Sequence, residues 1–359
     1  MNFVHTRGGH CGSSALRDLL EHHGLDYGAG PLSEAMVFGL SGAMAFAFAD
    51  DLIPFDGSGA KLPFYLNGRS EGLERDLCAH LGITFEVRRS DHPVVGWAWL
   101  ADELAHGAPT LIWVNLKDLD YQQVKLDNTR HAVVVTAVDE AAGTVAVADH
   151  DFHNLQTLGL DALARARSAR AFPGPVRHAT AILRFPAQLP PLDGAVAAGL
   201  RRVLATMRSA EPVAWEISGA TGPTTVVTYR QGLSALDALI DSCAGWPQRF
   251  GDGLSDALRL LHVLLERAGT GGGFYRRFEA RFLDEAAAAL DDVQLRAAAA
   301  HYTALAAHWR EVARSLRQED VAAAHRAALG GLQQARELEA EGLELLEACL
   351  EHQVAGSTA

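Results

Sequence analysis

The sequence predicts an α+β protein, with an antiparallel sheet in its first half and a mostly helical second half. Two patterns carry this prediction. Apolar residues at 131–138 and 144–149 flank a short polar turn, which is typical of a β-hairpin. Beyond residue 190, apolar residues recur at helical spacing in alanine-rich segments.

The length and composition indicate two domains. The chain has 359 residues, of which 48% are hydrophobic, enough to bury a large core. A proline-containing stretch at 188–191 is typical of a linker. We therefore expect a first domain at 1–188 and a helical bundle at 189–359, the first carrying the active site and the second covering its cleft.

Charge and cysteine content exclude several classes of function. The formal net charge is −13, which argues against nucleic acid or an anionic membrane as the main partner. The start of the chain lacks a signal-peptide pattern, and no apolar run is long enough to span a membrane, so we expect a cytoplasmic protein. The four cysteines are scattered without a CxxC pair, which argues against a zinc knot or a disulfide framework.

The first element is a helix that begins near Cys11. Gly8 and Gly9 form a loop before it, and we expect Ser13 or Ser14 to cap the helix. A thiol at this position faces unpaired backbone N–H groups, which favour the nucleophilic thiolate and lower its pKa. Cys11 is therefore the candidate nucleophile, and we expect the other three cysteines to lie in the core.

Helices and strands alternate between residues 33 and 115. A second helix begins at Ser33, and the apolar segment 37–48 is expected to lie buried beside the first helix. The following elements are a short strand at 61–66, a helix at 72–81, a strand at 83–88, a helix at 96–106 and a buried strand at 110–115.

The hairpin brings two chemically important residues together. After a polar loop at 117–129, His131 starts one strand and Asp149 ends the next, so antiparallel pairing places them side by side. Papain-like folds assemble their Cys-His-Asp or Cys-His-Asn sites in this way. The imidazole accepts the thiol proton, and the carboxylate orients the imidazole. His150 and His153 are competing bases, and Asp151 is the competing acid.

Other histidines lie near the nucleophile. The backbone N–H of Cys11, joined by His5, is predicted to form an oxyanion hole. His10 is expected to pack or to gate the site. An acid and several histidines of this region could form a metal site, but their spacing is not that of a typical ligand set. We therefore expect no metal, and we expect no cofactor. The residues of that possible metal site are His5, His10, Asp18, His22 and His23.

The remaining elements are mostly helical. A small helix at 158–169 and a strand at 177–185 precede the linker, and a loop is expected at 219–223. The predicted helices of the second half lie at 195–207, 233–241, 255–267, 274–290, 295–316 and 321–350.

Two stretches resemble the butirosin-biosynthesis acyltransferase (BtrH) family. The first contains His5, His10, Cys11 and Ser13, then Ala15, Leu16, Leu19 and Leu20 before Gly24. The second combines the glycine-rich segment 271–276 with 282–287 and resembles the helical domain of that family. Together the two stretches extend the resemblance over nearly the whole chain.

The resemblance implies a papain-like, cysteine-dependent acyltransferase. Such an enzyme moves an acyl group from the phosphopantetheine thioester of an acyl carrier protein to a small-molecule amine, through an acyl-cysteine intermediate. The thiol and the imidazole carry over to Cys11 and His131, with Asp149 as the third member. Substrate-binding residues do not carry over, and a homodimer is compatible with the sequence.

Several alternatives stay open from the sequence alone. The same three residues would serve a cysteine peptidase, an amidase, a thioesterase or a cyclase. A non-enzymatic scaffold with a degenerate site is a further alternative. The glycine-rich loop at 269–273 either packs the two domains together or, through Arg276 and Arg277, contacts an anionic phosphopantetheine.

Overall fold

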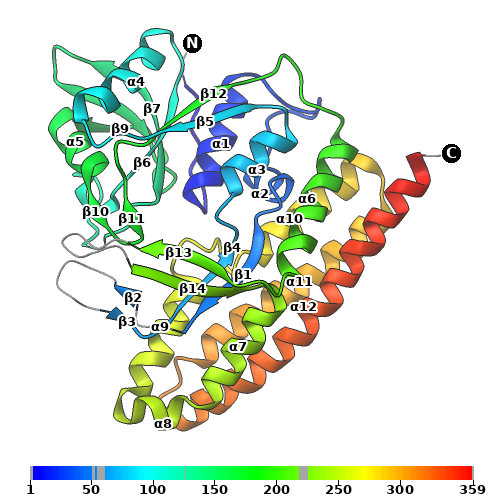
Figure 1. Ribbon diagram of the computed structural model, residues 1–359. Helices are drawn as coiled ribbons and strands as arrows, with labels where there is room; N and C mark the ends of the chain where they lie inside the picture. Colours follow the sequence, from blue (N-terminus) through cyan, green and yellow to red (C-terminus); the bar gives the residue numbers. More distant parts are fainter. Residues whose placement is uncertain (1–2, 51–52, 55–60, 126, 218–224, 358–359) are drawn as a thin grey trace.

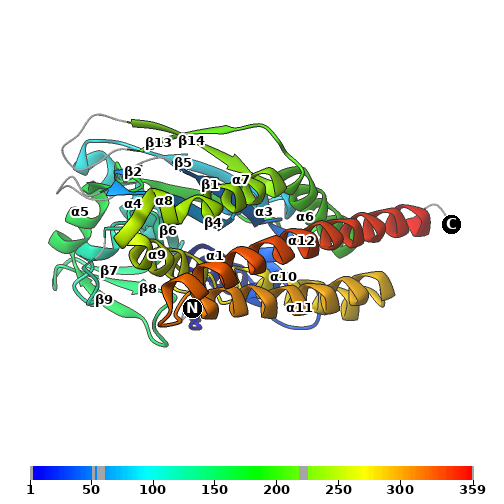
Figure 2. The same cartoon turned by 90° about the horizontal axis from the view of Figure 1, so that it is seen from below.

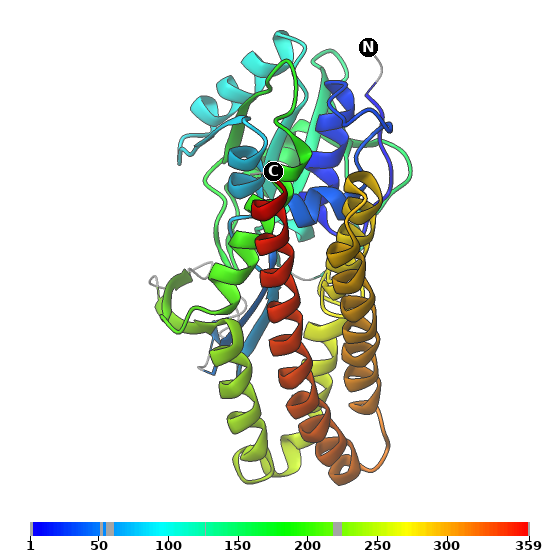
Figure 3. The same cartoon turned by 90° about the vertical axis from the view of Figure 1, so that its right-hand side faces the viewer.

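Two antiparallel sheets and a set of long helices make up the protein (Figure 1). The computed structural model describes residues 3–50, 53–54, 61–125, 127–217 and 225–357. The six-stranded sheet and the N-terminus lie at one end, and the long helices extend away from them (Figure 3). The predicted α+β class, with antiparallel sheets and a largely helical second half, is confirmed.

The six-stranded sheet has the order β5-β12-β6-β7-β8-β9, with antiparallel pairing throughout. Its strands are β5 (Thr84–Arg88), β6 (Thr110–Val114), β7 (His131–Asp139), β8 (Thr144–Ala148), β9 (Gln156–Gly159) and β12 (Thr180–Arg184). The predicted hairpin is present as β7 and β8, with Val134 opposite Ala148. This register places the start of β7 beside the end of β8.

The first five residues of β7 are buried on both faces, which explains the continuous apolar sequence after His131. Val133 and Val135 face a core shared with α4 (Pro93–Ala105) and α5 (Leu160–Ser168). Ala132 and Val134 face the opposite core, which contains the apolar side of α1 (Cys11–His22). Helix α1, which begins at Cys11, therefore packs directly on the strand that begins with His131.

The second sheet joins the two halves of the chain. Its order is β13-β14-β1-β4, formed by β1 (Met44–Ala49), β4 (Tyr65–Arg69), β13 (Val213–Ile217) and β14 (Thr225–Gln231). Strand β1 pairs with β14 through Ala47 and Gln231. One buried core consequently runs across the boundary predicted at 188/189. The two strands β13 and β14 were absent from the prediction, and the loop predicted at 219–223 lies outside the described residues.

Two predicted elements are divided in the structure. The strand expected at 61–66 becomes β3 (Lys61–Leu62) and β4, separated at Pro63, which has no N–H to give to a ladder. The helix expected at 158–169 is preceded by β9, an edge strand that ends at Gly159. The apolar segment 37–48 is buried as predicted, with Gly42 turning the chain between helix and strand at a φ of 63°.

The remaining short elements and helices complete the fold. The short strands are β2 (Ile53–Pro54), β10 (Arg170–Ala171) and β11 (Gly174–Pro175), and the 3-10 turns are η1 (Leu116–Asp118) and η2 (Gly251–Gly253). The other helices of the first half are α2 (Glu34–Leu40) and α3 (Leu73–His80). Those of the second half are α6 (Leu192–Met207), α7 (Gly232–Ala244), α8 (Trp246–Phe250), α9 (Leu254–Glu266), α10 (Arg276–Leu290), α11 (Val293–Ser315) and α12 (Val321–Ser357).

Helices α11 and α12 run side by side along the second half (Figure 2). The three long helices predicted at the end of the chain are thus present. Among the described helices, none is both long enough and apolar enough to cross a lipid bilayer.

Arg276 ties the helical half to the second sheet. Its side chain is fully buried, and its Nε donates to Glu339 Oε1 at 2.6 Å. Its Nη1 donates to the carbonyl oxygens of Ala45, Gly68 and Phe274, so one guanidinium connects β1 and β4 with α12. Arg276 therefore packs the two halves together, while a ligand contact of the exposed Arg277 stays a prediction.

We expect Arg276→Ala to lower the free energy of unfolding by about 3–5 kcal/mol, because Glu339 would be left as a buried charge without its partner. The neighbouring Arg277 is exposed. Arg277→Ala is thus the matched control, expected to change stability by less than about 0.5 kcal/mol. Urea denaturation of both variants measures the difference, and equal losses in the two variants would contradict the buried tie.

Candidate active site

Cys11 is the first residue of helix α1, and His10 caps that helix. The Nδ1 atom of His10 accepts the backbone N–H of Ser13 at 3.2 Å. The prediction that Ser13 or Ser14 caps the helix is therefore wrong, because the helix begins at Cys11 and the capping position falls on the residue before it. The role expected for His10 in packing gains support from its edge-on contact with Tyr275.

Glu34 holds the loop that delivers the nucleophile. Its carboxylate accepts the backbone N–H groups of Gly9 at 2.8 Å and His10 at 2.9 Å. It also accepts the hydroxyl of Ser13 at 2.8 Å. The next two N–H groups, those of Cys11 and Gly12, begin the helix and have no carbonyl one turn earlier to bind. These N–H groups are the backbone donors available to an oxyanion that forms near the sulfur.

His131 and Asp149 meet where the hairpin predicted them to meet. His131 Nε2 lies 2.8 Å from Asp149 Oδ2, and the Asp149 side chain is fully buried. The hydroxyl of Tyr121 donates to the same oxygen at 3.1 Å. Asp151 is exposed and its carboxylate accepts from Gln122 instead. The structure therefore places Asp149, and not Asp151, at the imidazole.

His131, rather than the competing histidines, has the largest effect on the thiol of Cys11. His150 Nδ1 lies 3.2 Å from Asp149 Oδ1, whereas His131 contacts Oδ2, and the charge of His150 adds a smaller contribution that lowers the pKa of Cys11. His153 is exposed. His131 is thus the histidine that most strongly lowers the pKa of the Cys11 thiol. Since its Nε2 is engaged by Asp149, Nδ1 is the nitrogen left to face the sulfur.

The charges of this array favour a thiolate. Burial opposes ionisation of Cys11, but the hydrogen bond and the charge of His131 outweigh it and lower the pKa of Cys11 to about 7. Burial likewise disfavours the imidazolium of His131, but Asp149 outweighs it and raises the pKa of His131 to about 10. Thiolate and imidazolium therefore coexist between these two values.

The other three cysteines behave in the opposite way. All of them are buried, as predicted, and burial raises the pKa of each thiol to about 12. These residues are Cys78, Cys243 and Cys349. Cys11 is partly exposed and is the cysteine with chemistry at neutral pH.

His5 has a different position from the one predicted. Its Nδ1 lies 2.6 Å from Asp18 Oδ2, and its Nε2 lies 3.1 Å from the carbonyl oxygens of both Asp149 and Phe152. Both ring nitrogens are occupied, so His5 has no N–H to offer an oxyanion at Cys11. It instead fixes the backbone of Asp149, and the prediction of His5 as an oxyanion donor is corrected accordingly.

Two residues that the sequence did not single out lie close to the nucleophile. The charge of Arg69, at the end of β4, contributes to lowering the pKa of Cys11. Tyr275 lies close enough to Arg69 for the charge of the guanidinium to act on its hydroxyl, and it contacts His10 with ring centroids 5.8 Å apart. Its φ of 68° is rare outside glycine, so the glycine-rich loop before it holds a strained backbone that brings the ring to the site.

A cleft of about 340 Å³ lies near the site, and its lining residues include Arg69, Glu74, Trp113, Arg130 and Val176. The backbone oxygen of Arg130 lies 4.0 Å from the sulfur of Cys11. Arg130 therefore connects the lining of this cleft with the sulfur of Cys11.

The described residues contain one group of side chains with the ligand types for a metal. Atoms of His131, Asp149 and His150 lie within 4.8 Å of one another. Both histidine nitrogens stand at hydrogen-bond distance from the carboxylate. A metal would therefore have to replace the protons that orient His131.

Comparison with known protein families gives two matches that together span most of the chain. Residues 10–150 match the family model of the N-terminal domain of butirosin biosynthesis protein H. Residues 161–346 match a domain of unknown function, DUF4872. No curated protein matches the chain.

Alkylation of Cys11 by iodoacetamide should become faster through a midpoint near pH 7, because the thiolate exists above the pKa of about 7. An ordinary thiol has its midpoint at about 8.5. In Asp149→Asn the charge that sustains the imidazolium is lost, so the midpoint should rise by at least about one pH unit. Mass spectrometry of the Cys11 peptide measures the rate. An identical midpoint in both proteins would contradict the claim that the charge of Asp149, acting through His131, lowers the pKa of Cys11.

Glu34→Ala should expose the backbone N–H groups of Gly9 and His10 to solvent exchange. These two amides lose their acceptor, whereas amides inside β7 keep their strand partners. Hydrogen–deuterium exchange compares the two regions, with the exposed Glu341→Ala on α12 as the control. If the loop amides stay protected in Glu34→Ala, the carboxylate is not what holds the loop.

Proposed function

Because the chain belongs to the butirosin biosynthesis protein H family, we propose that it is a cysteine-dependent acyltransferase that forms amides in natural-product biosynthesis. The observation that carries this proposal is the array of Cys11, His131 and Asp149, in which the thiol has a pKa of about 7. The array also supports a papain-like fold for the first half, in which a nucleophile helix packs on the sheet that holds the base.

The first step is acylation of Cys11. The thiolate attacks the carbonyl carbon of an acyl thioester, and a new carbon–sulfur bond forms while the carbonyl oxygen becomes an oxyanion. The backbone N–H groups of Cys11 and Gly12 stabilise this oxyanion. When the intermediate collapses, the bond to the donor sulfur breaks, and the His131 imidazolium protonates the departing thiolate.

The second step transfers the acyl group to an amine. Once Cys11 is acylated its negative charge is gone, and that charge is among the causes that raise the pKa of His131. Losing it makes the imidazole a better acceptor of the amine proton. The amine nitrogen attacks the acyl carbon, His131 takes the proton, and the Cys11 thiolate leaves with its electron pair. Asp149 orients the imidazole throughout.

The helical half contributes by excluding water from the acyl-enzyme. Phe278 on α10 lies so close to Gly9 that a Cβ there would be 3.0 Å from its ring. Tyr275 packs on His10 from the same segment. This arrangement supports the expectation that the second half covers the active site, and hydrolysis is the side reaction that such a cover suppresses.

The partners follow from the family and from the charge. The proposed donor is the phosphopantetheine thioester of an acyl carrier protein, and the proposed acceptor is a small-molecule amine. A net charge of −13 is favourable for attracting a cationic acceptor. The chemistry requires no metal and no bound cofactor, since the phosphopantetheine enters with the donor.

Intact-mass analysis of the full chain tests this function. The protein is incubated with a carrier protein that bears short-chain, aminoacyl or aromatic acyl thioesters. We expect an increase by the mass of one acyl group, located by peptide mapping to Cys11, absent in Cys11→Ala, and slowed at least about a hundredfold in His131→Ala. Addition of an amine should then discharge the adduct as an amide.

Three results would overturn the proposal. The first is no adduct with any carrier thioester while Cys11 still reacts with iodoacetamide. The second is discharge to the free acid at a rate that amines do not change, which would indicate a thioesterase. The third is cleavage of peptides without any thioester donor, which would indicate a peptidase.

A further inference from the structure

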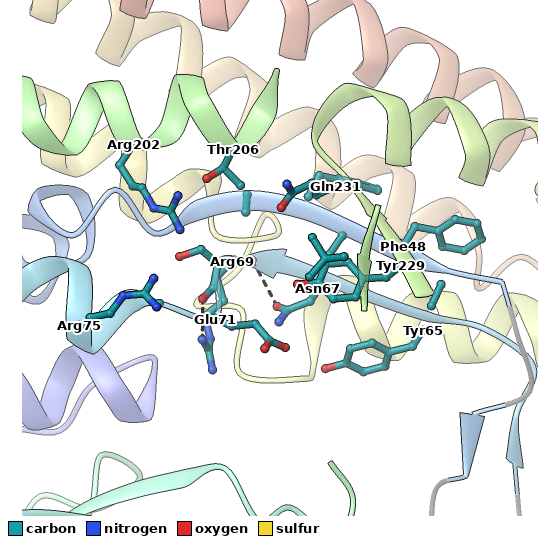
Figure 4. Close-up of a pocket in the computed structure, with 17 residues that line it drawn as sticks. Phe48, Tyr65, Asn67, Arg69, Glu71, Arg75, Arg202, Thr206, Tyr229 and Gln231 are labelled. Atoms are coloured by element: carbon teal, nitrogen blue, oxygen red, sulfur yellow. Dashed lines mark hydrogen bonds between the residues drawn. The ribbon is translucent and has the colours of Figure 1, made fainter. Parts of the chain in front are cut away.

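A pocket of about 490 Å³ lies on the face of the second sheet (Figure 4). It is distinct from the cleft of about 340 Å³ near Cys11. Strands β1 and β4 form its floor, and α3, α6 and β14 supply side chains around it. Arg69 and Glu71 line both this pocket and the cleft. The two spaces therefore adjoin each other at the end of β4.

One end of the pocket gathers three guanidinium groups, those of Arg69, Arg75 and Arg202. Figure 4 shows Arg75 and Arg202 reaching toward the same space from two different helices. Asp76 holds both of them, with Oδ1 at 2.9 Å from Arg75 Nε and Oδ2 at 2.7 Å from Arg202 Nε. One carboxylate thus fixes the direction of two cations through their Nε atoms.

The terminal nitrogens of these two arginines are available to a ligand. Within the described part of the chain, the hydrogen bonds of Arg75 and Arg202 involve Nε alone. Gly72 leaves the space that Arg75 occupies, because a Cβ at Gly72 would lie 2.5 Å from Arg75 Nη2. A paired guanidinium edge is the donor geometry that carboxylates and phosphates bind.

The charge balance of this end is positive although the protein as a whole is acidic. The carboxylate of Glu71 is bound in a bidentate manner by Arg130, at 2.6 and 3.1 Å. Asp76 offsets one of the three cations that line the pocket and Glu74 acts on Arg69, so one positive charge remains without a carboxylate. The opposite end is aromatic, with Phe48, Tyr65 and Tyr229.

We propose that this pocket binds a small molecule that combines an oxyanion, a carboxylate or a phosphate ester, with an apolar body. Arg75 and Arg202 bind the oxyanion, and the aromatic end holds the apolar part. That the occupant takes part in acyl transfer rests on the proposed function. The occupant then belongs to the acyl donor or to the acceptor, because the pocket adjoins the cleft beside Cys11 through Arg69.

Equilibrium binding to the full-length protein tests the proposal with two matched pairs of probes. Phosphopantetheine is compared with pantetheine, and 3-phenylpropanoate with 3-phenylpropanamide, by isothermal titration calorimetry. Each pair differs by its anionic group. We expect the anion to bind about tenfold more tightly than its neutral partner in at least one pair. The pair that shows the preference identifies the phosphate or the carboxylate as the source.

Variants of one helix locate the site. In Arg202→Gln the preference for the anion should be lost, and in Arg202→Lys it should be partly kept. Arg201→Gln is the matched control, since Arg201 is the exposed neighbour of Arg202 and does not line the pocket. Circular dichroism checks that each variant is folded. If Arg202→Gln is not folded, the partial loss of preference in Arg202→Lys still tests the proposal.

The proposal is overturned if neither anion is preferred, if no probe binds at millimolar concentration, or if the preference persists in Arg202→Gln. None of the probes carries a thioester, so the result does not depend on acylation of Cys11. A failure of the acyl-transfer function would instead appear as a missing mass adduct, and the two failures are therefore distinguishable.

Discussion

The buried hydrogen bond between Asp149 and His131 sets the charge state on which the whole site depends. A carboxylate without solvent contact requires donors, and His131, His150 and Tyr121 supply them. Because Asp149 holds the proton on His131, burial does not neutralise the imidazole, and the imidazolium in turn stabilises the thiolate of Cys11. Acid, base and nucleophile therefore form one electrostatic unit rather than three separate groups.

The rest of the fold keeps this unit in place from several directions. The β7–β8 register brings His131 to Asp149, and the packing of α1 on β7 brings Cys11 to His131. Glu34 fixes the loop before the nucleophile, and His5 fixes the backbone of the acid. The helical half adds Tyr275. Each of these contacts joins segments that are distant in sequence, so the site is a property of the complete chain.

Local patterns in the sequence predicted much of this arrangement, and non-local contacts account for what they missed. The short turn between two apolar runs was enough to place His131 beside Asp149, and the Gly-Gly loop was enough to place Cys11 at a helix start. Acidic residues are common in the first turn of a helix, and Glu34 is one of them. The sequence around it therefore does not reveal that it binds the loop before Cys11. Strands β14 and β1 pair although more than half of the chain separates them in sequence. The hydrophobic pattern of either strand does not indicate its partner. His5 was predicted as an oxyanion donor, but its ring contacts Asp18 instead.

The sheet shared between the halves has a consequence for modularity. The segments that match the two family domains meet in one sheet, with β1 from the first segment hydrogen-bonded to β14 from the second. Either segment produced alone would present an unpaired strand edge, which invites intermolecular association. The N-terminal segment alone would also lack the guanidinium that satisfies the carbonyls of Ala45 and Gly68. The two segments are thus inseparable as folding units, and neither could be transplanted onto another scaffold without its counterpart.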